Sequence, residues 1–159
     1  MKIQLVNVLK KASVLFAILL VTVVASAQGQ TLGPRVRVNI PFDFHIGETK
    51  LSSGKYSVGR ARQNSDDVVI SVEDERGRAK ALRTSMPVVA RDTTSTAKLV
   101  FHRYGDQYFL YQIWPAGATT GRQFLKSHSE REILQTLASV GQTDPKMLVD
   151  TVTITGDLR

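Results

Sequence analysis

Residues 98–114 read KLVFHRYGDQYFLYQIW and carry the strongest β-hairpin signal in the chain. Two strand-like runs, 98–104 and 107–114, flank Gly105-Asp106, a two-residue turn suited to positive φ. The second run is apolar on both faces, with Tyr108, Leu110 and Trp114 on one face and Phe109, Tyr111 and Ile113 on the other. Because such a strand needs cover on both sides, it is expected in the middle of a sheet.

Residues 35–46 predict a second strand, with one buried face. Apolar side chains recur at every second position, at Val36, Val38, Ile40, Phe42, Phe44 and Ile46. This period-two alternation is typical of a half-buried strand and does not fit a helix. Pro41 has no backbone N–H to donate, so the strand is expected to bend there or to lie at an edge.

Further strands are expected between turns rich in glycine and charged residues. They cover 56–62, 68–72, a run within 79–90 that is interrupted or ended near Met86-Pro87, and a last strand within 147–155. Residues 63–67 are expected to form a polar loop.

One short helix is predicted near 128–140. Ser127 and Ser129 each precede a Glu by three residues, at Glu130 and Glu132, so two capping boxes overlap at the helix start. Gly141 follows as a C-terminal stop. A helix of about three turns is marginal by itself, so its apolar face is expected to dock on the sheet.

The predicted fold class is mainly β. Residues 35–159 are expected to form a single domain of seven to eight antiparallel strands with one short C-terminal helix. Two architectures fit this order of elements, a closed or partly closed barrel and a two-sheet sandwich. We favour the barrel-like form, because successive strands are linked by short turns.

The first 27 residues predict an export signal. Three lysines precede 14 mostly apolar residues, and Ala25-Ser26-Ala27 is a small-x-small cleavage site that places the cut between Ala27 and Gln28. The apolar run is short for a membrane-spanning helix, which needs about 20 residues, and no second such run follows. We therefore expect a secretory signal peptide at 1–27, a flexible leader at 28–34, and no transmembrane span after the signal is removed. The expected location is periplasmic or extracellular.

The net charge of +7 is inflated by the signal segment. Removing its three lysines leaves 18 basic and 14 acidic side chains, a net charge of +4. This mildly basic balance, together with export, argues against nucleic acid as a partner.

Three blocks of sequence resemble a group of small exported bacterial proteins of unknown function. The first is Pro41-Phe42-Asp43-Phe44 followed by Gly47, Leu51, Gly54, Tyr56 and Val58; the second is LVFHRYGDQYFL at 99–110; the third joins Gly121-Arg122, Lys126-Ser127 and Glu130-Arg131-Glu132. Relatives often have Pro-Ala where this chain has Ser52-Ser53, which bears on the turn conformation. The resemblance implies an exported β-domain and implies no activity, substrate or cofactor.

No motif for catalysis, metal binding or cofactor binding is recognisable. The chain has no cysteine, no phosphate-binding loop and no Gly-x-Ser-x-Gly elbow. Asp43 and His45 share a strand face, but a metal site would need a third ligand, such as His102. We expect His102 to be partly buried and bonded to backbone or to Asp106, and His128 to be exposed. The prediction is a non-enzyme without cofactor or metal.

Six of the 11 aromatic residues fall within 101–114. Such a cluster is what the core of a small domain requires, and Tyr and Trp can also contact a ligand. We interpret the cluster as core first, and name Tyr104, Tyr108, Tyr111 and Trp114 as the best contact candidates. The pairs Arg35/Arg37 and Arg60/Arg62 could meet anionic polymers, but interleaved acids favour a solvated face.

The leading functional hypothesis is an exported, non-enzymatic binding or interaction module of the bacterial envelope. Its partner would be an envelope protein, a glycan or a lipid. The alternative is a β-barrel carrier of a small apolar or lipid-like ligand, which predicts an enclosed apolar cavity. The third hypothesis is an envelope hydrolase, which predicts a cleft where His45 or His102 meets Ser or Asp.

Overall fold

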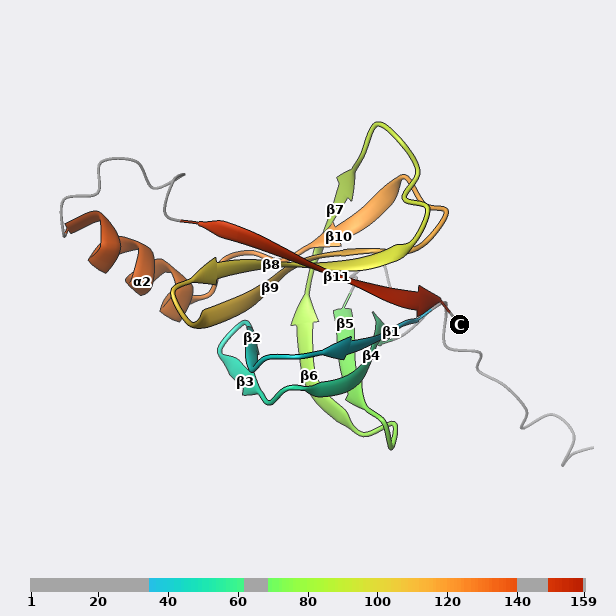
Figure 1. The fold of residues 1–159 in the computed structure, drawn as a ribbon, viewed down its shortest axis with the longest axis horizontal. Coiled ribbons are helices and arrows are strands. Elements are labelled where there is room, and N and C mark those ends of the chain that lie inside the picture. Colours follow the sequence, from blue (N-terminus) through green and yellow to red (C-terminus); the bar gives the residue numbers. More distant parts are fainter. Residues whose placement is uncertain (1–34, 62–68, 140–148, 159) are drawn as a thin grey trace, which may run out of the picture. The chain divides into compact units, whose positions relative to one another are not determined.

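A mainly β architecture with one short helix is present in the computed structural model of the chain, as Figure 1 shows. The structure describes residues 35–61, 69–139 and 149–158. Their elements are β1 (Val36–Ile40), β2 (Phe44–Ile46), β3 (Thr49–Leu51), β4 (Gly54–Arg60), β5 (Val69–Asp74), β6 (Ala79–Thr84), β7 (Met86–Val89), β8 (Ala97–Tyr104), β9 (Gln107–Trp114), β10 (Thr120–Gln123), α2 (His128–Ser139) and β11 (Asp150–Leu158). The predicted signal peptide, its cleavage site, the leader at 28–34, the loop at 63–67 and Gly141 lie outside the described residues.

The predicted hairpin at 98–114 is confirmed as β8 and β9. The two strands pair antiparallel, and Gly105 in the connecting turn has a φ of 59°. β9 is a central strand, as its two apolar faces predict. One of its edges pairs with β8, and the other is shared by β2 and β10.

The strand predicted at 35–46 is two strands. β1 ends at Ile40, immediately before Pro41, and the chain resumes strand structure at Phe44. β1 pairs antiparallel with β4, whereas β2 pairs parallel with β9 through His45 and Phe109. The expectation of a fully antiparallel fold is therefore wrong, because the break at Pro41 lets the chain cross to β9 in the parallel direction.

The strands form a nearly closed barrel. Their order is β3-β2-β9-β8-β11-β1-β4-β5-β6, and β10 pairs with both β9 and β7. Only Ser85 separates β6, which pairs with β5, from β7, which pairs with β10. Residues 79–89 therefore link the β5 end of the strand order to β10, and Figure 1 shows β7 continuing from β6.

The described residues contain eleven strands, rather than the seven to eight expected. Two of the additional strands are β3 and β10, of three and four residues. The other two additional strands arise because the runs predicted at 35–46 and 79–90 are each divided into two strands, at Pro41 and at Ser85. Strands this short carry too few residues to show a period-two pattern.

The core lies between the inner faces of the strands. Phe44, Phe101 and Leu99 are fully buried there, and the rings of Phe44 and Phe101 meet edge to face at 5.6 Å. Phe42 adds a second edge contact to Phe101 at 5.3 Å and stacks on Tyr108 at 3.9 Å. Packed aromatic rings thus fill the end of the barrel nearest β2 and the hairpin turn.

Helix α2 begins where the capping boxes predict. The Ser127 hydroxyl accepts a hydrogen bond from the Glu130 backbone N–H at 3.1 Å. The Glu48 carboxylate, from the turn between β2 and β3, accepts from the His128 backbone N–H at 2.6 Å and from the Ser129 hydroxyl at 2.7 Å. The helix N-terminus is therefore satisfied partly by a residue 80 positions earlier in the chain.

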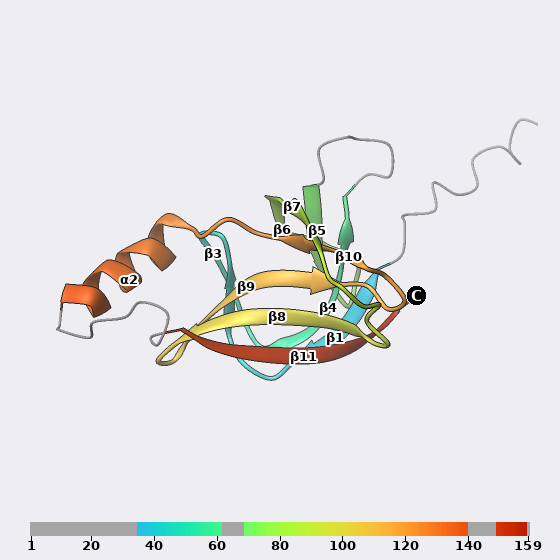
Figure 2. The same cartoon turned by 90° about the horizontal axis from the view of Figure 1, so that it is seen from above.

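The apolar face of α2 does not dock on the sheet as expected. Ile133, Leu134 and Leu137 are only half-buried, and Glu130 is the one buried residue of the described helix. Figures 1 and 2 show the helix extending away from the turn between β8 and β9. Within the described residues, no helix is long and apolar enough to cross a membrane.

We predict that Phe101→Ala destabilises the fold severely. The ring is fully buried and contacts two other rings, so the substitution leaves a cavity and should cost about 3–5 kcal/mol. Urea denaturation of the purified protein measures this loss. The control is Val89→Ala, which truncates a side chain that is 74% exposed and should change stability by less than about 0.5 kcal/mol. Equal losses would contradict the assigned core.

Candidate binding surfaces

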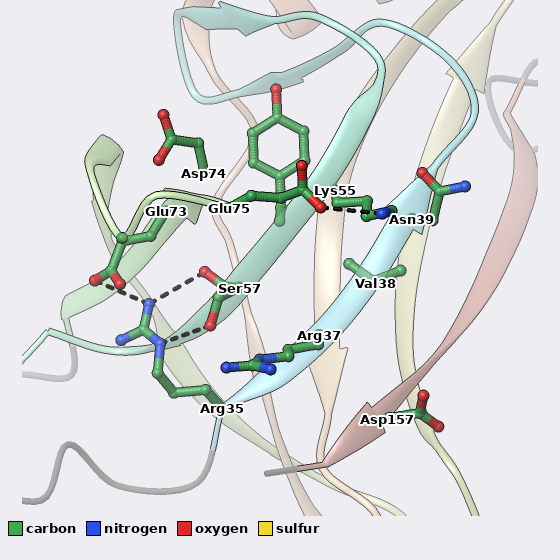
Figure 3. Close-up of a pocket in the computed structure, with 12 residues that line it drawn as sticks. Arg35, Arg37, Val38, Asn39, Lys55, Ser57, Glu73, Asp74, Glu75 and Asp157 are labelled. Atoms are coloured by element: carbon green, nitrogen blue, oxygen red, sulfur yellow. Dashed lines mark hydrogen bonds and ion pairs between the residues drawn. The ribbon is translucent and has the colours of Figure 1, made fainter.

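A polar groove of about 510 Å³ crosses the outer face of β1, β4 and β5. In β1, Val36, Val38 and Ile40 are buried, so Arg37 and Asn39 project outward between them. Figure 3 shows the groove, and its lining residues are Arg35, Arg37, Val38, Asn39, Lys55, Tyr56, Ser57, Glu73, Asp74, Glu75, Gly77 and Asp157.

Arg35 is fixed at one end of this groove. Its guanidinium forms an ion pair with Glu73 at 3.0 Å and donates to the Ser57 hydroxyl at 2.9 Å and to the Ser57 carbonyl at 3.1 Å. Gly59 makes room for the side chain, because a Cβ there would lie 2.8 Å from Arg35 Cγ. The prediction of a solvated face for Arg35 is therefore only partly right, since the side chain is 11% exposed.

Acidic residues balance the cations of the groove. Lys55 pairs with Glu75 at 3.0 Å, and Asp74 pairs with Arg78 at 2.8 Å and with Lys80 at 3.3 Å. The hydrogen bond from the Arg78 backbone N–H, with further bonds from the side chains of Arg78 and Lys80, lowers the pKa of Asp74 well below its usual value. The lining holds three cationic and four acidic side chains, a polar surface unsuited to an apolar ligand.

Of the four aromatic contact candidates, two are buried and two are half-buried. Tyr104 is 4% exposed and Trp114 is 7% exposed, while Tyr108 and Tyr111 are half-buried. Trp114 packs on Gly121, where a Cβ would lie 2.7 Å from the indole ring. The interpretation of the cluster as core first agrees with this placement, since all four pack within the fold.

A buried polar cluster joins the hairpin to α2. The Glu130 carboxylate accepts hydrogen bonds from Tyr104 at 2.9 Å and from His102 Nδ1 at 2.8 Å. The His102 ring also stacks on Tyr111 at 3.8 Å. Burial, followed by the charge of Glu130, raises the pKa of Tyr104. The prediction that His102 bonds to backbone or Asp106 is wrong, because the packing of α2 brings in a carboxylate 28 residues away.

The serines nearest to Glu130 in sequence have partners other than His102. A carboxylate–imidazole pair needs a nucleophile on the other side of the imidazole. Ser127 and Ser129, the serines nearest to Glu130 in sequence, bond to each other at 3.0 Å and to the helix start and Glu48. The cluster instead anchors the first turn of α2 to the barrel.

The remaining histidines are scattered. His45 stacks on Phe109 at 4.8 Å, and burial lowers its pKa. Asp43 accepts from the Ser53 backbone N–H at 2.9 Å, and exposed His128 lies 3.5 Å from Glu132. Among the described residues, no group of three His, Asp or Glu side chains could hold a metal ion.

Exposed apolar side chains gather around residues 79–89. Leu82 on β6 is 61% exposed, and Met86 and Val89 on β7 are 43% and 74% exposed. Leu125, at 62%, follows β10, the strand that pairs with β7. We call Leu82, Met86 and Leu125 the β6–β7 apolar set; Val89 projects to the opposite face of β7 from Met86. The sequence offered little signal for this set, because Leu82 and Met86 sit in a run that reads as an ordinary strand.

Comparisons with protein-family models, with curated proteins and with solved structures found no match. The resemblance to small exported proteins therefore stays a prediction.

We predict that Tyr104→Phe changes the alkaline stability of the protein. The pKa of Tyr104 in the fold is raised above 10.0, so its contribution is complete below pH 10.0 and is lost as the pH rises and the unfolded phenol ionises. Removing the bond to Glu130 should also cost about 1.5–3 kcal/mol at neutral pH. Denaturation at a series of pH values measures both effects. An alkaline loss as steep in the variant as in the parent would contradict the assignment.

We predict that Glu48→Gln weakens the start of α2. Bonds from the Ser129 hydroxyl and the His128 backbone N–H lower the pKa of Glu48, so its contribution is present above pH 4.5 and is lost as the pH falls through the lowered pKa. Hydrogen exchange should show weaker protection of the His128 and Ser129 amides in the variant. In the parent, that protection should decline on acidification. Unchanged protection in both experiments would mean that Glu48 is not the cap.

Proposed function

We propose that the chain is an exported, non-enzymatic binding module of the bacterial envelope, whose partner is another envelope protein. Export is supported by the signal segment at 1–27, with cleavage between Ala27 and Gln28. The periplasm or the extracellular space is accordingly the proposed location. The resemblance of residues 38–134 to small exported proteins supports the same location.

The observation that carries this proposal is the β6–β7 apolar set. Large apolar side chains that are exposed to solvent and lie on successive strands mark a contact surface. Leu82 on β6 and Leu125 after β10 are 61% and 62% exposed. Aliphatic side chains of this kind suit the apolar centre of a protein–protein contact.

The proposed contact does not use the aromatic side chains of the hairpin. Tyr104 and Trp114 are buried, and the partly exposed rings of Tyr108 and Tyr111 stack on Phe42 and His102. Rings that already have partners gain less from a further contact than exposed aliphatic groups do. Of the four aromatic candidates, Tyr108 and Tyr111 could contribute at most to the rim of an interface.

The carrier alternative receives less support. It needs an enclosed apolar cavity, whereas the rings of Phe42, Phe44, Phe101 and Tyr108 pack together inside the barrel. The groove of about 510 Å³ is open and lined mainly by charged side chains. Such a surface does not favour a lipid-like ligand.

Single-cysteine photo-cross-linking tests the proposed contact. The chain has no native cysteine, so a photoreactive label can be attached at one chosen position. We expect Leu82→Cys and Met86→Cys, expressed with the native export segment and irradiated in intact cells, to give the same discrete protein adduct. Arg37→Cys, an exposed position in the polar groove, should not give it.

The outcomes separate the hypotheses. An adduct from Leu82→Cys and Met86→Cys that disappears when the other position is changed to Ser supports the β6–β7 contact. Adduct formation from Arg37→Cys alone would place the contact in the groove and overturn the assignment. Native mass spectrometry of the unlabelled protein that showed a retained small molecule instead would support the carrier.

A further inference from the structure

Two arginines project from the sheet on the core side of the barrel. Arg60 on β4 and Arg83 on β6 both lie directly opposite Ile70 of β5. Residues directly opposite each other in antiparallel strands project to the same face. Ile70 is 2% exposed and belongs to the core, so Arg60 and Arg83 share its inner face.

A third arginine has the same orientation from the other side of the barrel. Arg122 on β10 lies opposite Ile113 of β9, which is 3% exposed and also belongs to the core. Burial and then the charge of Arg60 lower the pKa of Arg122.

Within the described residues, none of these three arginines has an acidic partner. None of them takes part in an ion pair within residues 35–61, 69–139 and 149–158. By contrast, Arg35 on the neighbouring outer face is paired with Glu73. Arg83 and Arg122 are half-buried, so water compensates their charges only in part, whereas Arg60 is exposed. Arg37 also has no carboxylate partner among the described residues, but it is exposed on the outer face and stays solvated.

The guanidinium of Arg83 is held in a defined place. It lies against Gly47 in the turn between β2 and β3, where a Cβ would come within 2.7 Å of Arg83 Nη1. Gly47 has a φ of 62°, a conformation that favours glycine. The turn therefore has both the backbone and the open space needed to receive the guanidinium.

We propose that Arg60, Arg83 and Arg122 form a binding site for an oxyanion that carries two or more negative charges, such as a phosphate group or a polycarboxylate. Guanidinium groups bind such oxygens in paired, planar contacts. An anion between them would offset the repulsion of like charges. The site lies on the inner face and is independent of the β6–β7 apolar set, so it goes beyond the proposed protein contact.

Thermal unfolding of the purified protein tests this site. Inorganic phosphate should raise the Tm in a saturable way, measured against chloride at equal ionic strength. Citrate in a second series shows whether carboxylate groups serve as well as phosphate. Arg122→Gln and Arg60→Gln should each weaken the apparent affinity by about tenfold or more, and Arg37→Gln, the matched control, should leave it unchanged.

A second measurement keeps the test valid if a glutamine variant folds poorly. Arg122→Lys keeps the charge and loses the planar fork, so it should fold and bind phosphate with intermediate affinity. In addition, Arg60→Gln should raise the Tm in low salt without phosphate, because it removes one of two neighbouring like charges. The proposal is overturned if phosphate and chloride have equal effects, or if Arg37→Gln weakens binding as much as Arg122→Gln.

Discussion

Strand β9 is covered on both faces, and the need for this cover determines the positions of many surrounding segments. On the inner side, Leu110 and Ile113 join the core. On the outer side, Phe109 lies beneath His45 and Tyr104, and Trp114 packs on Gly121 of β10. An ordinary barrel strand needs cover from one side only, so the outer cover here has to come from segments beyond the hairpin.

The outer cover explains why α2 is attached by a carboxylate. Glu130 reaches the outer face of the hairpin and accepts bonds from His102 and Tyr104, two residues that would otherwise be buried there without acceptors. Glu48 fixes the same helix turn from the opposite side. Both anchors act within the first turn, which is consistent with Leu134 and Leu137 staying half-buried farther along the helix.

The parts of this fold that the sequence predicted are those with local, repeated signals. The hairpin turn at Gly105, the break at Pro41 and the helix start at Ser127 each depend on neighbouring residues, and all three are observed. The contacts of Glu130 and the inner orientation of Arg122 depend on pairings between distant segments. A charged residue in a polar, four-residue strand such as β10 is usually solvated, so its position opposite Ile113 had no local signal.

The backbone at β6 and β7 limits how a partner can bind there. The Ala90 N–H donates to the Thr119 carbonyl, and the N–H groups of successive residues in a strand point in alternate directions. The backbone nitrogen of Pro87 therefore points away from β10, and proline has no N–H to offer to a further strand. Lys80 is an extra residue in the pairing of β6 with β5, a bulge that bends the start of that edge. These are features that discourage the addition of another strand. A partner at this surface would therefore contact the side chains of Leu82 and Met86, rather than extend the sheet through backbone hydrogen bonds.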